Sequence, residues 1–186
     1  SGLALGVDTL AHRHALMAGL NTIAVPGSGL DDSVLYPQSN LSLAHEILEH
    51  GGALLSEYEP NFKATEWSFP RRNRIMAGMS HATLVIEAGE KSGTLITARL
   101  ATDYNRELLV VPGSIFSENS KGVHQFLKLG ATPVTTPDDI LDALSIEKST
   151  IEKANHDDDI VLSNLQEPQS FETLLERTRL SSEELS

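Results

Sequence analysis

Short apolar runs alternate with longer amphipathic stretches along most of the chain. Four of these runs are three or four residues long, and each stops at a proline or a polar residue. They are residues 22–25, 53–55, 83–86 and 108–111. This length and composition predict buried strands of a parallel sheet. A fifth strand is expected over residues 132–135, at an edge of the sheet, because Pro133 cannot donate a hydrogen bond to a neighbouring strand.

The amphipathic stretches between the runs predict helices. They cover residues 7–18, 39–50, 95–104 and 121–129, and another helix is expected to begin at Pro137. Glycines follow three of them, at Gly19, Gly51 and Gly130, where a helix commonly ends. Strands and helices alternate throughout, and this order predicts an α/β fold with a doubly wound, mostly parallel sheet.

The composition changes after about residue 144. Residues 145–159 are rich in Glu, Lys and Ser and contain a run of three aspartates, which is typical of a linker. Residues 160–186 place leucines and Phe171 in a pattern that resembles the start of a winged-helix module. We therefore predict an α/β domain over residues 1–144, a linker over 145–159 and a truncated helical segment over 160–186. The chain opens on a glycine loop of the kind that normally follows a strand, so further strands are expected to precede Ser1.

The overall composition narrows the class of protein. The chain has 186 residues, 40% of them hydrophobic, which suffices for one core domain and a small appendage. It has no cysteine, so disulfides and thiolate metal sites are excluded, and a cytoplasmic location is expected. No apolar run reaches the length of about eighteen residues that a membrane-spanning helix needs, so no membrane partner is expected.

The net charge of −12 argues against nucleic-acid binding at first sight. The distribution of charge matters more than the sum, because residues 141–186 hold 11 acidic and 4 basic residues whereas residues 1–140 hold 15 and 10. Within residues 1–140, three arginines fall close together, at Arg71, Arg72 and Arg74. A local basic cluster can bind phosphate on an acidic protein, although long-range electrostatic steering will be weak.

Two glycine loops occur early in the chain. Ser1, Gly2 and Gly6 precede the first predicted helix, whose free amides and positive dipole end favour an anion. The alternative is a tight turn without a ligand, and the spacing alone does not separate the two. The second loop, residues 26–31, follows a strand but does not match the dinucleotide-binding pattern, so a structural loop is favoured there.

An arginine-rich segment predicts the start of another helix, because Pro70 suits a first turn. Arg71 and Arg74 share a face at helical spacing, and Arg72 lies about 100° from Arg71. Cations are unfavourable at the positive end of a helix, so three of them favour an anion site over an ordinary charged helix start. Phe69, just before them, is placed to stack on a nucleobase.

Two later loops offer further phosphate contacts. Lys91, Ser92, Gly93 and Thr94 link a strand to a helix at the usual ligand edge of such sheets. The order of these residues is not that of a Walker A loop, so ATP binding is not expected. Lys121 begins another helix, where a phosphate contact and a solvated lysine are equal alternatives.

No pattern in the sequence indicates catalysis or metal binding. The seven histidines have no metal-ligand spacing, and no acid–base or nucleophile set is evident. Glu87, at the end of a predicted strand, is expected to order a loop. We therefore expect no metal, no cofactor and no catalytic residue.

Taken together, these blocks resemble the DprA/Smf family of DNA-processing proteins. The blocks are SGLALGVDTLAH, VPGSGLDDSVLYPQSN, GGALLSEY, FPRRNRIMAG, EAGEKSGTLITARLA and LLVVPGSIFSENSKGVHQFLKLGA, in this order over nearly all of residues 1–140. The resemblance implies a Rossmann-like domain that binds single-stranded DNA with little sequence preference and forms a homodimer. It further implies that the protein protects incoming DNA in natural transformation and helps to load RecA, without catalysis. The implied DNA-binding residues are Ser1, Gly2, Gly6, Phe69, Arg71, Arg72, Asn73, Arg74, Lys91, Ser92, Gly93, Thr94 and Lys121.

The chain departs from the family pattern in two places. The upstream Gly-Ser-Arg segment, whose arginine would lie in the same pocket, is missing. Glu66 stands shortly before Phe69, where a basic residue would help to bind DNA.

Two other functions are kept as alternatives. One is a nucleotide phosphoribohydrolase resembling the lysine-decarboxylase-like (LOG) family, which has a PGGxGTxxE motif. Here Gly93 and Thr94 match the Gly-Thr pair, but Thr97 stands where the catalytic glutamate would be. The other is an interaction domain that has lost DNA binding, which the acidic tail suggests.

Overall fold

The strands form at the positions that the apolar runs predict. The computed structural model describes residues 1–146, and within them the strands are β1 (Ile23–Ala24), β2 (Ala53–Leu54), β3 (Ala82–Val85), β4 (Glu107–Val110) and β5 (Thr132–Pro133). All the pairings between them are parallel: β1 with β2, and β3, β4 and β5 in that order, with β5 at an edge as expected. The α/β fold with parallel sheets is therefore confirmed.

The described strands form two sheets, whereas the sequence predicts one continuous sheet. The terminal amino group of Ser1 donates to the carbonyl of Ile23 at 3.0 Å, and the amide of Val25 donates to the carbonyl of Ser1 at 2.8 Å. β2 pairs with the opposite edge of β1, because its amides bond to the carbonyls of the alternate residues Thr22 and Ala24. The first residues of the chain therefore run along the free edge of β1.

The helices also match the predicted stretches, with ends shifted by a few residues. They are α1 (Val7–Met17), α2 (Leu41–Glu49), α3 (Ser68–Met79), α4 (Thr94–Asp103), α5 (Lys121–Lys128) and α6 (Pro137–Ala143), with 3₁₀ turns η1 (Gln38–Asn40) and η2 (Glu118–Ser120) before α2 and α5. Gly19, just after α1, has φ 68°, a conformation that ends a helix readily because glycine has no Cβ. Thr136 and Asp139 form a capping box at α6.

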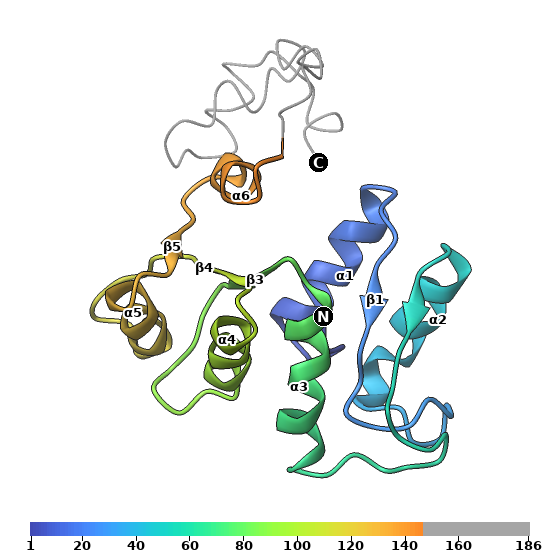
Figure 1. Cartoon of the computed structure of the whole chain (residues 1–186). Helices are drawn as coiled ribbons and strands as arrows, with labels where there is room; N and C mark the ends of the chain where they lie inside the picture. Colours follow the sequence, from blue (N-terminus) through green and yellow to red (C-terminus); the bar gives the residue numbers. More distant parts are fainter. Residues whose placement is uncertain (147–186) are drawn as a thin grey trace, which may run out of the picture. The chain divides into compact units, whose positions relative to one another are not determined.

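Two apolar clusters hold these elements together. The first joins the N-terminal loop, α1, β1 and α2, and its buried members are Leu3, Leu16, Ala24, Leu35, Leu43, Ala44 and Ile47. The second joins β3, β4, α4 and α5, and its buried members are Val85, Ala88, Leu95, Ala98, Val110, Val123 and Phe126. Helix α3 packs on α4 and, through Arg72, on the first loop, so it lies between the two clusters (Figure 1).

The rest of the chain lies outside the described residues. Residues 1–146 form one unit, which includes the predicted α/β domain. The predicted linker beyond Ile146 and the predicted helical segment 160–186 fall on residues that the structure does not describe. Among the described helices, none combines the length and the apolar character that crossing a membrane requires.

Candidate functional site

Three adjoining cavities lie where the first loop meets the carboxyl end of β3 and the start of α3. The largest, about 610 Å³, lies between residues 4–8 and the loop after β3, and it is lined by Glu87, Lys91, Ser92 and Thr94 among others. The second, about 450 Å³, is lined by Phe69, Arg72, Asn73, Gly93, Thr94 and Thr97. The third, about 240 Å³, is lined by Gly2, Ala4, Leu5, Tyr36, Pro37, Phe69 and Arg72. The carboxyl edge of a parallel sheet is the usual position of a ligand in this architecture.

Helix α3 presents the predicted arginines on two different faces. Arg72 lines the 450 Å³ cavity, whereas Arg71 and Arg74 are not among its lining residues. At about 100° per residue, Arg71 and Arg74 lie across the helix from Phe69. There both approach the Glu57 carboxylate, Arg74 Nη2 at 2.5 Å and Arg71 Nε at 3.6 Å. Arg72 therefore lies in this cavity, whereas Arg71 and Arg74 pair with Glu57 outside its lining. Contact of the three arginines with DNA stays a prediction.

Arg72 is buried and bonded to the backbone. It is 6% exposed, and its Nη1 donates to the carbonyl of Gly2 at 2.9 Å and to the carbonyl of Val25. Its Nε donates to Oδ1 of Asn73 at 3.1 Å. Burial lowers the pKa of Arg72 from its ordinary value, and the negative charge of Asp8 opposes this shift. The guanidinium thus brings a partly desolvated positive charge to the cavity.

Two loop glycines leave the space that α3 needs. A Cβ on Gly2 would lie 2.7 Å from the Arg72 guanidinium, and one on Gly27 would lie 2.6 Å from the Phe69 ring. Real Cβ atoms do not approach other atoms so closely, so any side chain at either position would displace Arg72 or Phe69. Gly2 and Gly27 therefore provide the space in which the Arg72 and Phe69 side chains pack. The sequence alone does not reveal this role.

The amides of the first loop already have an acceptor within the chain. Oδ2 of Asp8 accepts from the N–H of Gly2 at 2.9 Å and from the N–H of Ala4 at 3.2 Å. Gly6 has φ 81° and precedes α1, so the loop turns there as the glycine pattern predicts. Ser1 lines the 450 Å³ cavity. Direct phosphate contact by Ser1, Gly2 and Gly6 stays a prediction.

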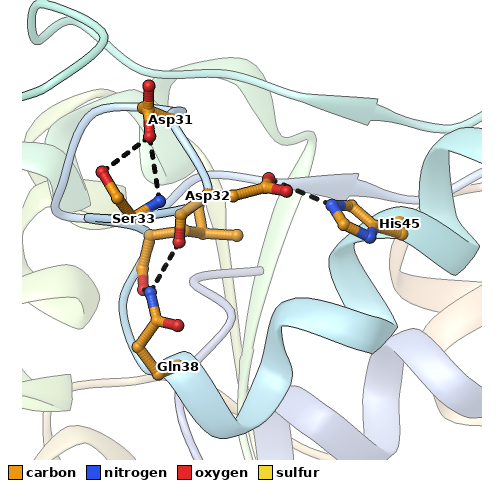
Figure 2. Close-up of polar contacts among 6 residues, drawn as sticks. Asp31, Asp32, Ser33, Gln38 and His45 are labelled. Carbon is orange, nitrogen blue, oxygen red and sulfur yellow. Dashed lines mark hydrogen bonds and ion pairs between the residues drawn. The ribbon is translucent and has the colours of Figure 1, made fainter.

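The second glycine loop is structural. Residues 24–29 are buried, and the amide of Gly29 donates to the carbonyl of Phe62 at 2.8 Å. Figure 2 shows how the segment after it is ordered: Asp31 accepts from the backbone and hydroxyl of Ser33, and His45 lies 3.0 Å from Oδ1 of Asp32. The two hydrogen bonds from Ser33, the hydroxyl bond first, lower the pKa of the Asp31 carboxyl. Gly27 of this loop packs against the Phe69 ring, and the amides of Gly29 and Asp31 donate to backbone carbonyls.

The loop after β3 forms the far wall of the 610 Å³ cavity. Ser92 Oγ accepts from the amide of Thr94 at 3.2 Å, which orders the start of α4, and Lys91 is exposed at the cavity edge. Nδ2 of Asn119 donates to Oε2 of Glu87 at 3.3 Å, in line with a loop-ordering role for this carboxylate. A Cβ on Gly93 would meet nothing within 4 Å, so this glycine faces open space.

Lys121 has an acidic partner on the preceding 3₁₀ turn η2. Its Nζ is 2.7 Å from Oε1 of Glu118, and this hydrogen bond raises the pKa of the lysine. It is not among the residues that line the three cavities. A phosphate contact by Lys121 therefore stays a prediction and would require the lysine to exchange Glu118 for phosphate.

The sequence analysis missed Asp8 and Tyr36. Asp8 lines both larger cavities, and its place in the first turn of a predicted helix next to a glycine loop is the signal that could have found it. The Tyr36 ring lies 5.6 Å from the Phe69 ring, centroid to centroid, and is 52% exposed. No local pattern pairs residues so far apart in the sequence. No group of three or more potential metal-ligating side chains occurs within residues 1–146.

The fold and this edge define a class: a Rossmann-like α/β domain that brings an arginine, an aromatic ring and glycine loops to the carboxyl end of a parallel sheet. The sequence model of the family described as DNA recombination-mediator protein A matches residues 1–145, and the chain belongs to this family. Its members include proteins named DprA and Smf.

Comparisons with individual proteins agree with this family assignment. The chain is 44% identical over 144 residues to protein Smf of Escherichia coli K12, and this alignment covers 77% of this chain and 38% of that protein. It is 43% identical over 141 residues to DNA processing protein DprA of Streptococcus pneumoniae R6, and that alignment covers 76% of this chain and 49% of the relative. The chain thus spans less than half the length of these two relatives.

Two solved structures share the fold. The X-ray structure of DprA from Streptococcus pneumoniae aligns with a TM-score of 0.69 at 42% identity, over 76% of this chain and 49% of that one. DNA processing protein A from Helicobacter pylori, whose structure addresses its single-stranded DNA binding mode, aligns with a TM-score of 0.68 at 33% identity, over 77% and 64%.

Proposed function

We propose that this chain binds single-stranded DNA without strong sequence preference, as part of a recombination mediator. The observation that carries the proposal is that the buried Arg72 guanidinium and the Phe69 ring line the same two cavities. A positive charge beside an aromatic ring suits a nucleotide, since the charge attracts phosphate while the ring stacks on any base. The single-stranded DNA binding of the Helicobacter pylori relative supports the same ligand.

The loops around the cavities suggest how the strand lies. Lys91 with Ser92, Gly93 and Thr94 supplies a cation, hydroxyls and the start of α4 on one side. These groups suit phosphate oxygens, because a cation and hydroxyls lie here at the positive end of the α4 dipole. Phe69 and Tyr36 on the other side suit a base. Arg71 and Arg74 are placed to contact the strand outside the pocket.

Membership of the family supports a wider role. We propose that the intact protein forms a homodimer in the cytoplasm, protects incoming DNA and helps to load RecA, with a binding rather than a catalytic role. The threonine at position 97 supports this, since it lines the cavity where the phosphoribohydrolase motif would need a glutamate.

Substitution of Phe69 tests the proposal. Phe69→Leu keeps an apolar group against Gly27 but removes the stacking face, so affinity for a dT oligomer should fall by about 1–3 kcal/mol. The salt dependence should not change, because phosphate contacts remain. Phe116→Leu, an exposed phenylalanine outside the cavities, is the control. Fluorescence anisotropy measures both, and equal affinity of Phe69→Leu and wild type would contradict the proposed pocket.

A further inference from the structure

Asp8 places a negative charge inside the region that the proposed function gives to DNA. Its Oδ2 accepts from the amides of Gly2 and Ala4, at 2.9 Å and 3.2 Å. Two converging amides beside a helix start are a common cradle for a phosphate oxygen. A carboxylate oxygen is also an anionic acceptor and fills the same cradle. The first loop therefore already holds an anion supplied by the chain itself.

The backbone of Gly2 connects this carboxylate to the buried arginine. Its N–H donates to Asp8, and its carbonyl accepts from Arg72 Nη1 at 2.9 Å. None of the ion pairs found among residues 1–146 includes Arg72. The Asp8 charge nevertheless favours the charged guanidinium. Asp8 and Arg72 thus bind the two backbone polar groups of the same residue, Gly2, and their charges are opposite.

Asp8 also lines the 450 Å³ and 610 Å³ cavities, so its charge acts on whatever enters either of them. A phosphate at the first loop would meet a like charge and would find the amides of Gly2 and Ala4 occupied. A phosphate beside Lys91 and Thr94, on the opposite wall of the 610 Å³ cavity, meets a cation and a helix start instead.

We propose that Asp8 occupies the anion site of the first glycine loop and thereby determines which part of the nucleotide contacts that loop. The base and sugar face residues 1–6, and the phosphates are held on the side of Lys91 to Thr94. Asp8 is then a positioning residue that keeps phosphate away from the Gly2 and Ala4 amides. This inference rests on the proposed binding of single-stranded DNA and specifies its orientation.

The substitution Asp8→Asn in the full chain tests the effect of the Asp8 charge separately from its effect on the order of the first loop. The asparagine side chain still offers an oxygen to the two amides, whereas the negative charge is gone. Affinity for a dT oligomer at low salt should rise about three- to tenfold. The slope of log affinity against log salt should steepen by about 0.7, the value for one more phosphate contact on a single strand. Asp103→Asn is the control, because it removes one negative charge at the far end of α4. It should change the affinity and the salt slope much less than Asp8→Asn does.

Asp8→Ala opens the cradle and allows a second readout that needs no DNA. Inorganic phosphate should raise the melting temperature of Asp8→Ala, because a ligand that binds the native state stabilises it, and should raise that of wild type less. If Asp8→Asn melts like wild type yet binds dT with unchanged or lower affinity and an unchanged slope, the inference is wrong. If phosphate stabilises Asp8→Ala no more than wild type, it is wrong as well.

These experiments also distinguish the two proposals. Absence of dT binding by wild type and by Asp8→Asn would contradict the proposed function. The phosphate-dependent shift of Asp8→Ala would still support or overturn an anion site held by Asp8. Binding of dT by wild type with no effect of Asp8→Asn would leave the function in place and contradict the inference alone.

Discussion

At the scale of single residues, the site depends on two glycines and the side chains that fit against them. Gly2 and Gly27 have no Cβ, and the freed volume holds the Arg72 guanidinium and the Phe69 ring. Arg72 in turn ties the first loop to the end of β1 through the carbonyls of Gly2 and Val25. The same contacts that hold the fold therefore hold the proposed pocket.

Gly27→Ala should destabilise the protein. The new Cβ would lie 2.6 Å from Phe69 Cδ1, so the ring must move, and such overpacking costs about 1–3 kcal/mol. Gly93→Ala is the matched control, since its Cβ would meet nothing within 4 Å and its φ of −58° suits alanine. Urea denaturation compares the free energies of unfolding, and equal values for the two variants would contradict this fit.

Arg72→Met should lower the free energy of unfolding by about 2–4 kcal/mol, because it leaves two buried carbonyls without their donor. Arg74→Met breaks an exposed ion pair with Glu57 and should cost less than about 1 kcal/mol. Chemical denaturation again measures both. A larger loss for Arg74→Met than for Arg72→Met would show that the two arginines have been assigned to the wrong roles.

At the scale of elements, α1 is joined to β1 through a buried histidine. His12 is 0% exposed, its Nδ1 lies 2.8 Å from Oγ1 of Thr22, and its Nε2 is buried without a partner. Burial, assisted by the positive amino terminus, lowers the pKa of His12 from 6.5 to about 4, against the opposing effect of Asp8. The helix that follows the first loop is therefore packed on a neutral imidazole.

Stability should fall with acid because of His12. The unfolded chain binds the proton below about pH 6.5 and the folded chain only below about pH 4, so the contribution is complete above 6.5 and is lost between these values. From about pH 7.5 to 4.5 the loss from this group is about 2.5 kcal/mol. His12→Gln should show a smaller decline in urea denaturation, and His50→Gln, on the surface, should not. Parallel declines in wild type and His12→Gln would contradict the assignment.

The elements were predictable where the pattern was local. Apolar runs located every described strand, and the rule for proline placed β5 at an edge, because these depend on a few neighbouring residues. The division of α3 into two faces was partly predictable, since helical spacing groups Arg71 with Arg74. The Glu57 partner and the Tyr36–Phe69 contact were not, because each depends on packing that joins distant segments. The Asp8 bonds are local, and the position of Asp8 in a first helical turn beside a glycine loop could have indicated them.

At the scale of the whole molecule, the proposed site for a polyanion is a small, local region of an acidic chain. The net charge of −12 opposes long-range attraction of DNA, so affinity must come from short-range contacts at the cavities. Base stacking on Phe69 needs an unpaired base, which a duplex does not offer at its surface. The protein should therefore discriminate strongly between single-stranded and double-stranded DNA.

The most direct test measures the affinity of the full chain for a dT oligomer and for a duplex of the same length at a series of salt concentrations. Fluorescence anisotropy reports the binding. The account predicts tighter binding of the single strand at every salt concentration. It also predicts that log affinity falls with log salt by about 0.7 for each phosphate contacted. Equal affinity for single strand and duplex, or no binding of the single strand at low salt, would contradict the central claim.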